Sequence, residues 1–171
     1  MNYKALIREV PDFPKPGILF YDITTLLKNA QAYRAIADEL AARYEGQGIA
    51  KVIGIESRGF ILGGTLAARL GAGFVPVRKP GKLPADIFEV EYNLEYGSSV
   101  LAIHRDAVAA GERVLIVDDL LATGGTAAAT VDRVRQLGGE IAGLDFLIEL
   151  KGLKGRDRLT GYNVHSMIIY P

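Results

Sequence analysis

Hydrophobic and polar positions alternate along the chain with two different periods, which predict a succession of helices and strands. After Asn29, a residue type that favours helix N-caps, apolar side chains recur at three- and four-residue spacing through 33–44, the pattern of an amphipathic helix. The short apolar run at 51–55 predicts a strand. We expect a helix rich in small residues from about 60 to 70, followed by a strand at 74–77.

The second half of the chain continues this alternation. Between 87 and 96, apolar or aromatic side chains at even positions alternate with Glu or Asn, which predicts a strand with one solvent-facing side. With 98–103 it is expected to form an antiparallel hairpin. The fully apolar run at 114–117 is typical of a strand buried on both faces and precedes a helix at about 126–137. Two further strands are expected at about 141–148 and 164–169. Alternating strands and helices predict an α/β fold with a mainly parallel sheet.

Composition narrows the class of protein. The chain has 171 residues, of which 49% are hydrophobic, which fits one domain with a single core. It has no cysteine, which excludes disulfides and thiolate metal sites. Twenty Lys and Arg balance twenty Asp and Glu, so a nucleic-acid-binding surface is not expected. The sequence shows neither a run of ~18 apolar residues nor a signal-peptide pattern, so we expect no membrane association and a cytoplasmic location.

The most informative segment is RVLIVDDLLATGGT at 113–126. It predicts a buried strand that ends in Asp118 and Asp119, followed by a loop and a helix. The loop comprises Ala122, Thr123, Gly124, Gly125 and Thr126. In open α/β sheets ligands bind beyond the carboxyl ends of the strands, where glycine-rich backbone can aim several amides at one anion. The loop therefore predicts a site for a terminal phosphate, the alternative being an ordinary strand–turn–helix.

The two acids beside this loop indicate what carries the phosphate. Carboxylates repel phosphate, but they accept hydrogen bonds, and a ribose offers two adjacent hydroxyl donors. Asp118 and Asp119 therefore indicate a ribose 5-phosphate. Carboxylates also hold Mg²⁺, directly or through water. No Gly-Lys-Ser/Thr follows the glycines, so the segment is not a Walker motif.

The string VLIVDDLLATGGT resembles the phosphoribosyl-pyrophosphate motif of the type I phosphoribosyltransferases. The resemblance implies that the two acids hold the ribose hydroxyls while the loop holds the 5-phosphate. It implies Mg²⁺ bound with the substrate, which Asp118 could reach through water, and no direct protein ligand is assigned. It also implies a five-stranded, mostly parallel sheet flanked by helices, and a homodimer. Within a single domain of residues 1–171, an N-terminal hood at 1–30 and a flexible flap at 86–103 are expected.

Two further segments resemble the pyrophosphate side of that family. The string ESRGF contains Glu56, Ser57 and Arg58 after a predicted strand, and it is similar to the pyrophosphate loop of the adenine-specific members. The resemblance makes the Glu56–Ser57 bond a candidate non-proline cis peptide. In the basic segment that follows, Arg78 and Lys82 are the cations expected to approach pyrophosphate. The residues alone leave open a surface turn and a solvated basic loop.

The residues that bind the nucleobase are expected in the N-terminal segment. Residues 11–24 contain three prolines and two Phe and are expected to be irregular. The segment resembles the adenine-binding hood, which implies that Phe20 stacks on the base and that the backbone near Leu19 reads its edge. Phe13 is expected to pack in the core. Tyr21 stands where many relatives carry a basic residue, and it is grouped with the base-binding residues.

The string NLEYG at 93–97 resembles the flexible catalytic loop of the family. The resemblance makes Glu95 a candidate acid/base at the purine N7, and Tyr96 a residue that closes over pyrophosphate and ribose. The alternative is that Glu95 is one of several exposed acids on the wet face of a strand. His104 and His165 are expected to be structural.

Together these resemblances imply a transferase that makes AMP and diphosphate from adenine and 5-phosphoribosyl 1-pyrophosphate, a purine salvage reaction. One alternative is an enzyme of the same fold acting on another purine, although a 6-oxo purine would need a different edge reader. A second is a regulator that senses phosphoribosyl pyrophosphate. Such regulators usually add a DNA-binding domain or a basic surface, for which this chain offers neither length nor net charge.

Overall fold

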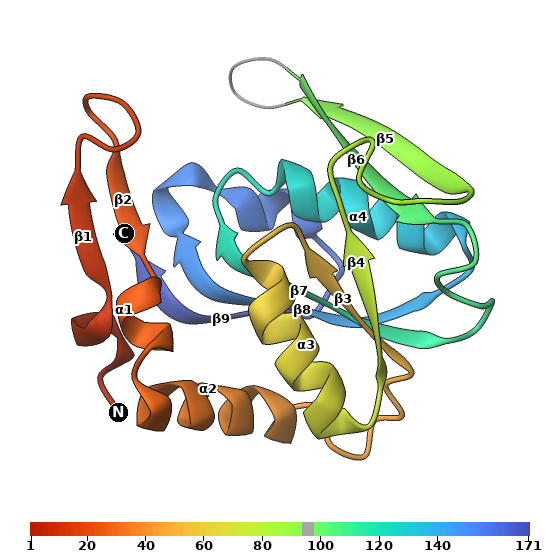
Figure 1. The fold of residues 1–171 in the computed structure, drawn as a ribbon, viewed down its shortest axis with the longest axis horizontal. Helices are drawn as coiled ribbons and strands as arrows, with labels where there is room; N and C mark the ends of the chain where they lie inside the picture. The colour runs from red at the N-terminus through yellow and green to blue at the C-terminus, as the bar shows by residue number, and fades with distance from the viewer. Residues whose placement is uncertain (94–97) are drawn as a thin grey trace.

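A parallel sheet of five apolar strands forms the centre of the protein (Figure 1). The computed structural model describes residues 1–93 and 98–171. The strands are β3 (Lys51–Ile55), β4 (Gly73–Val77), β7 (Arg113–Leu121), β8 (Glu140–Leu150) and β9 (Val164–Tyr170). They lie in the order β4-β3-β7-β8-β9, and every neighbouring pair is parallel. The expected five-stranded α/β architecture is confirmed, with no antiparallel member in this sheet.

Alternate side chains of the strands serve two cores, one on each face of the sheet. Val52 and Leu115 pack in the first core, with α2 (Ala30–Ala42) and α3 (Gly59–Leu70). Ile53 and Ile116 pack in the second core, with α4 (Gly125–Gln136). The predicted cap is confirmed, because the Asn29 side chain accepts a hydrogen bond of 3.0 Å from the amide of Ala32. Helices therefore cover both faces, as expected.

The predicted antiparallel hairpin is confirmed in β5 (Ile87–Asn93) and β6 (Ser98–His104). Phe88 and Val90 pack against the second core, while Glu89 and Glu91 are exposed. The predicted strand with one solvent-facing side is therefore confirmed. An isolated bridge between Arg78 and Ala102 ties the hairpin to the chain leaving β4. The hairpin thus stands over α4 at the carboxyl-terminal edge of the sheet (Figure 1).

The expectation that residues 11–24 are irregular holds for the loop at 12–18 and is wrong for the residues on either side of it. β1 (Arg8–Pro11) and β2 (Leu19–Asp22) pair as an antiparallel hairpin. Its loop is closed by Asp12, whose carboxylate accepts a 2.7 Å hydrogen bond from the amide of Gly17, and it contains a cis Phe13–Pro14 bond. The prolines lie at the end of β1 and in the loop, where they cost no ladder hydrogen bond. They obscured the strand pattern without breaking the strands.

Short helical turns connect these elements. They are η1 (Tyr3–Leu6), α1 (Thr24–Leu27), η2 (Lys151–Leu153) and η3 (Gly155–Leu159). No helix in the described ranges is both long and apolar enough to cross a bilayer.

The central strand β7 is longer than predicted, which changes where the two acids lie. β3 accompanies it only as far as Val117, whereas β8 continues beside it to Leu121, opposite Glu149. Asp118 and Asp119 therefore lie within the strand and not at its end. They occupy the part of β7 that has lost its β3 neighbour, which opens one side of the strand to a ligand.

Candidate active site

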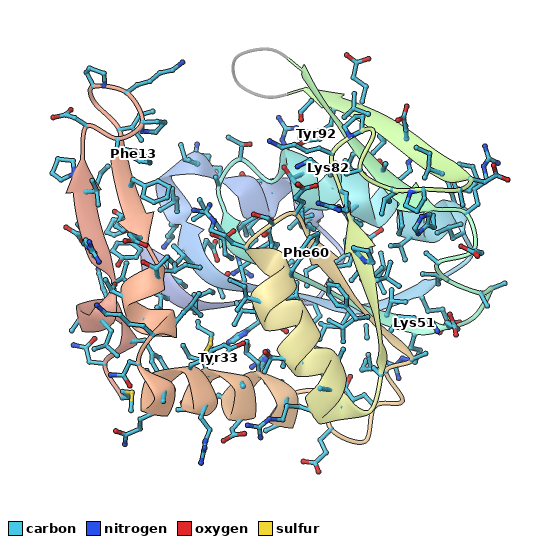
Figure 2. The ribbon with its side chains drawn as sticks, viewed as in Figure 1. Phe13, Tyr33, Lys51, Phe60, Lys82 and Tyr92 are labelled. Atoms are coloured by element: carbon cyan, nitrogen blue, oxygen red, sulfur yellow. The ribbon has the colours of Figure 1, made fainter. Side chains whose placement is uncertain are left out.

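A cavity of about 640 Å³ lies at the carboxyl ends of β3 and β7. Of the residues that the sequence singled out, its lining contains Glu56, Ser57, Arg58, Lys82, Asp118, Asp119, Ala122 and Thr126. Lys82 and Tyr92, both labelled in Figure 2, approach it from the segment after β4 and from β5. Figure 1 shows the β1–β2 hairpin at the left and the β5–β6 hairpin at the upper right, with the β7–α4 loop between them. The structure thus gathers segments that are far apart in the sequence.

The β7–α4 loop has the backbone geometry expected of an anion site. Gly124 has φ of 78°, a left-handed conformation that disfavours a side chain, and it caps the N-terminus of α4. Thr123 and Gly125 flank it. The first amides of α4 have no partners within the helix, so they are available to an anion at the helix end. The loop can therefore bind a phosphate through its backbone and through the Thr126 hydroxyl.

Asp118 and Asp119 are adjacent near the end of β7, where Asp119 is buried and Asp118 is half-buried. Burial raises the pKa of Asp118 well above its usual value, and the charge of Asp119 adds to the effect. Burial also raises the pKa of Asp119, although Arg58 opposes this shift through an ion pair of 2.6 Å. The backbone of Gly59 also packs closely against Asp118, because a Cβ built on Gly59 would lie 2.9 Å from Asp118 Oδ1. A ligand that donates hydrogen bonds or brings positive charge would stabilise both carboxylates.

Glu56 gathers the cations of the basic segment. Its carboxylate accepts hydrogen bonds from Lys82 Nζ at 2.5 Å, the Lys79 amide at 2.8 Å and Arg78 Nε at 3.4 Å. Burial alone would raise the pKa of Glu56, but the bonds from Lys82, the Lys79 amide and Arg78 outweigh it and lower the pKa to about 2. Its side chain faces cations, so it is placed to orient them. The peptide bond between Glu56 and Ser57 is cis, as the resemblance implied.

This arrangement predicts a pH-dependent contribution of Glu56 to stability. Because the pKa is lower in the folded state than its ordinary value of 4.5, the stabilisation is complete above about pH 5 and declines as the pH falls towards 2. We expect Glu56→Gln to reduce the free energy of unfolding by ~1–2 kcal/mol at pH 7, after allowance for the solvent exposure of the cations. The difference from wild type should narrow by about 1 kcal/mol at pH 3.5 in urea titrations. A gap that stays constant or widens with acidification would contradict this account.

The base side is only partly as expected. The Arg58 guanidinium carbon lies 5.4 Å from the centre of the Phe20 ring, so Arg58 reaches both Asp119 and the hood. Leu19 is 43% exposed at the start of β2. Phe13 is 50% exposed and meets Phe20 edge-to-face at 5.1 Å, so the expectation that it packs in the core is wrong. Tyr21 faces the opposite way and packs in the first core against Tyr170, at 3.9 Å between ring centres.

Tyr92 is a residue of the site that the sequence reasoning missed. The Thr126 hydroxyl donates a 3.2 Å hydrogen bond to the Tyr92 hydroxyl, which connects the β5–β6 hairpin to the loop. The alternation along 87–96 placed Tyr92 on the inner face, and that was the available signal. Glu95 and Tyr96 lie outside the described residues, so the catalytic roles expected of them stay predictions.

The site fits an Mg²⁺ ion that arrives with its substrate. Within residues 1–93 and 98–171, no group of three or more His, Cys, Asp or Glu side chains is placed to hold a metal. Mg²⁺ usually keeps several waters and takes one or two carboxylates together with substrate phosphates. Asp118 and Asp119 supply that number of carboxylates, and their raised pKa values indicate that a cation would be favourable there.

A parallel sheet with helices on both faces, and with paired acids and a glycine-rich loop at the end of its central strand, defines an open α/β protein of the class that binds ligands beyond the carboxyl ends of the strands. The phosphoribosyl transferase domain model matches residues 22–168. An adenine phosphoribosyltransferase of Acidobacterium capsulatum is 62% identical over 98% of this chain and 92% of its own length. The chain belongs to the phosphoribosyl transferase family and, within it, to the adenine phosphoribosyltransferases.

Solved structures agree with this placement. The crystal structure of adenine phosphoribosyltransferase from Thermoanaerobacter pseudethanolicus superposes with a TM-score of 0.94 at 53% identity, covering 98% of each chain. The enzyme from Saccharomyces cerevisiae superposes with a TM-score of 0.91 at 41% identity, covering 96% of each chain. That enzyme was crystallised with an imino-altritol bisphosphate and adenine.

Proposed function

We propose that this protein transfers the 5-phosphoribosyl group of phosphoribosyl pyrophosphate to adenine, giving AMP and diphosphate, and so serves purine salvage. The observation that carries the proposal is the pair Asp118–Asp119 beside the anion-binding loop at the open end of β7. Curated relatives with the same activity and a related structure with adenine bound support it.

The ribose 5-phosphate would lie along the end of β7. Asp118 and Asp119 would accept hydrogen bonds from the ribose hydroxyls, and the amides and hydroxyls of 122–126 would bind the 5-phosphate. Carboxylates so close to the anomeric carbon also favour the positive charge that develops on the sugar as the leaving group departs.

The pyrophosphate would lie towards the basic segment. The backbone around Ser57, with Arg58, Arg78 and Lys82, is proposed to bind it, while Glu56 holds Arg78 and Lys82 in position. Arg58 also forms an ion pair with Asp119 and lies over the Phe20 ring, so it connects the ribose side of the site to the hood. Mg²⁺, when bound, would neutralise charge on the departing pyrophosphate, and Asp118 could reach the ion through water.

The base would lie against the N-terminal hood. Phe20 is proposed to stack on adenine, and the backbone at Leu19 to read its edge. Tyr21 is excluded from direct stacking by its packing in the first core. Glu95 is proposed to relay the proton that leaves the purine as N9 attacks, and Tyr96 to help exclude water when the flap at 86–103 closes.

The oligomeric state and the location in the cell are proposed from the family resemblance alone. The protein is proposed to act as a homodimer in the cytoplasm, with residues 1–171 as one domain that includes hood and flap. Its partners are the small-molecule substrates adenine and phosphoribosyl pyrophosphate. Size-exclusion chromatography with light scattering would test the dimer, for which a mass near 37 kDa is expected from the 18.4 kDa chain.

Base selectivity is the sharpest test of the proposed substrate. With phosphoribosyl pyrophosphate and Mg²⁺ saturating, we expect kcat/KM for adenine to exceed that for hypoxanthine, guanine and xanthine by at least about tenfold, because a site built to bond the adenine edge leaves polar groups unpaired with 6-oxo bases. Product analysis should show AMP and diphosphate in equal amounts. A 6-oxo purine used as well as adenine would overturn the substrate assignment. The absence of turnover with every base would favour a ligand-sensing role.

A further inference from the structure

The turn η3 packs directly against the 122–126 loop. Gly155, its first residue, is buried, and a Cβ built there would lie 2.2 Å from the carbonyl oxygen of Ala122 and 2.8 Å from the amide nitrogen of Gly124. Reciprocally, a Cβ on Gly124 would lie 2.3 Å from the carbonyl oxygen of Gly155. The two backbones are therefore in direct contact, and neither glycine has room for a side chain.

Arg156 fixes η3 to the ends of two strands. Its guanidinium donates two hydrogen bonds to Glu149 of β8, of 3.1 and 2.5 Å, and one of 2.7 Å to the carbonyl oxygen of Val164. A longer bond of 3.4 Å reaches the Ser166 hydroxyl of β9. A paired fork of this kind fixes orientation as well as distance. These bonds connect the residue next to Gly155 to β8 and β9.

Glu149, the acid that Arg156 binds, is held in place within β8. Its side chain is only 7% exposed, and its Cα is in register with Leu121, the residue before the loop. The hydrogen bond from Arg156 lowers the pKa of Glu149, against the effect of burial, so the carboxylate is charged at neutral pH. A continuous set of contacts therefore leads from β8 through Arg156 and Gly155 to the loop.

This set of contacts has a functional reason. The loop holds two consecutive glycines, which give its backbone little stiffness of its own. Amides bind an anion well only when they are held in place before it arrives. We propose that Gly155, Arg156 and Glu149 form a support that holds the 122–126 loop in its phosphate-binding conformation, as positioning residues and not as ligands. This rests on the proposed function, because it assumes that the loop takes the 5-phosphate.

A matched pair of glycine variants tests the support. Gly155→Ala places a methyl group against the loop, whereas a Cβ at Gly152, in the neighbouring turn, would find its nearest atom, the carbonyl oxygen of Pro171, at 3.6 Å. Calorimetry of AMP and adenosine isolates the contribution of the 5-phosphate as the dissociation constant of adenosine divided by that of AMP. We expect Gly155→Ala to lower that ratio by about tenfold or more, with adenosine binding changed less than about threefold. Gly152→Ala should leave both constants as in wild type.

Arginine variants test the anchor without adding bulk. We expect Arg156→Gln to raise the KM for phosphoribosyl pyrophosphate by about tenfold, with kcat and the KM for adenine changed far less. Arg156→Lys should recover only part of the loss, since an ammonium keeps the charge but cannot form the paired fork. Arg158→Gln changes an exposed arginine of the same turn and serves as the control.

The outcomes separate this inference from the proposed function. If the wild-type protein binds AMP no better than adenosine, the proposed function fails. The inferred support is contradicted if the wild type binds AMP more tightly than adenosine and both Gly155→Ala and Arg156→Gln keep the same preference. This holds even where the melting temperatures of the variants fall. An equal loss of AMP and adenosine affinity would also contradict it. Should Gly155→Ala not fold, Arg156→Gln decides.

Discussion

Replacing Asp118 and Asp119 together by Asn is expected to lower kcat/KM for phosphoribosyl pyrophosphate by more than about a thousandfold, because two charge-assisted hydrogen bonds and the charge beside the reacting sugar are lost together. The protein should stay folded. Both carboxyls have a pKa raised by burial, so neutral side chains of the same shape remove a cost of the folded state. Steady-state kinetics and thermal unfolding by circular dichroism measure the two effects.

Single and remote variants serve as controls for this double change. Asp118→Asn alone keeps the ion pair between Asp119 and Arg58. Any loss of activity in this single variant is therefore not caused by the release of Arg58 from its partner. Asp132→Asn replaces an exposed acid of α4 and should be neutral. A double variant that is folded and keeps more than about a tenth of wild-type kcat/KM would remove the two acids from ribose binding.

The second large effect is expected at Glu95. Glu95→Gln should lower kcat by about a hundredfold, because the amide cannot exchange the purine proton, while the KM for adenine changes much less. Pre-steady-state measurement of AMP formation separates the chemical step from product release. The effect should persist across the pH range in which the wild-type enzyme is active.

Glu91→Gln is the matched control for Glu95→Gln. Glu91 is an exposed acid of β5, two positions before the end of the strand, and its replacement should leave kcat unchanged. Equal and small effects at both positions would mean that Glu95 is only another solvated acid of the flap. That result would require a different proton acceptor for the base.

Much of the fold could be predicted from periodicity. The apolar run at 51–55 coincides with β3, and the caps and spacing after Asn29 gave α2, because burial on one face imposes those patterns locally. The β1–β2 hairpin was missed because prolines interrupt its strand signal. The continuation of β7 past Asp119 to Leu121 was missed because it depends on β8 continuing alongside, a pairing that the local sequence does not encode.

The sequence predicted which segments form the candidate site, but it did not predict which side chains contact one another there. The acids and the glycine loop were found because their types are contiguous and chemically specific. The Glu56–Lys82 ion pair joins residues 26 positions apart, and the sequence suggested only that each lay near an anion. Tyr21 was grouped with Phe20 by adjacency, yet side chains alternate along a strand, so consecutive residues of β2 face opposite sides.

The role inferred for η3 shows a further limit of sequence reading. The segment Gly155–Leu159 has no motif character, and it begins 29 positions after Thr126, the last residue of the loop that it touches. Only the packing of Gly155 against Ala122 and Gly124 makes it part of the site. Positions of this kind are visible only once the backbone is known.

A crystal of the protein soaked with AMP tests the central claim most directly. The account predicts the 5′-phosphate within hydrogen-bonding distance of the backbone amides of 122–126, with the ribose hydroxyls on Asp118 and Asp119. Density that places the phosphate away from this loop, with the two acids free of the sugar, would contradict it.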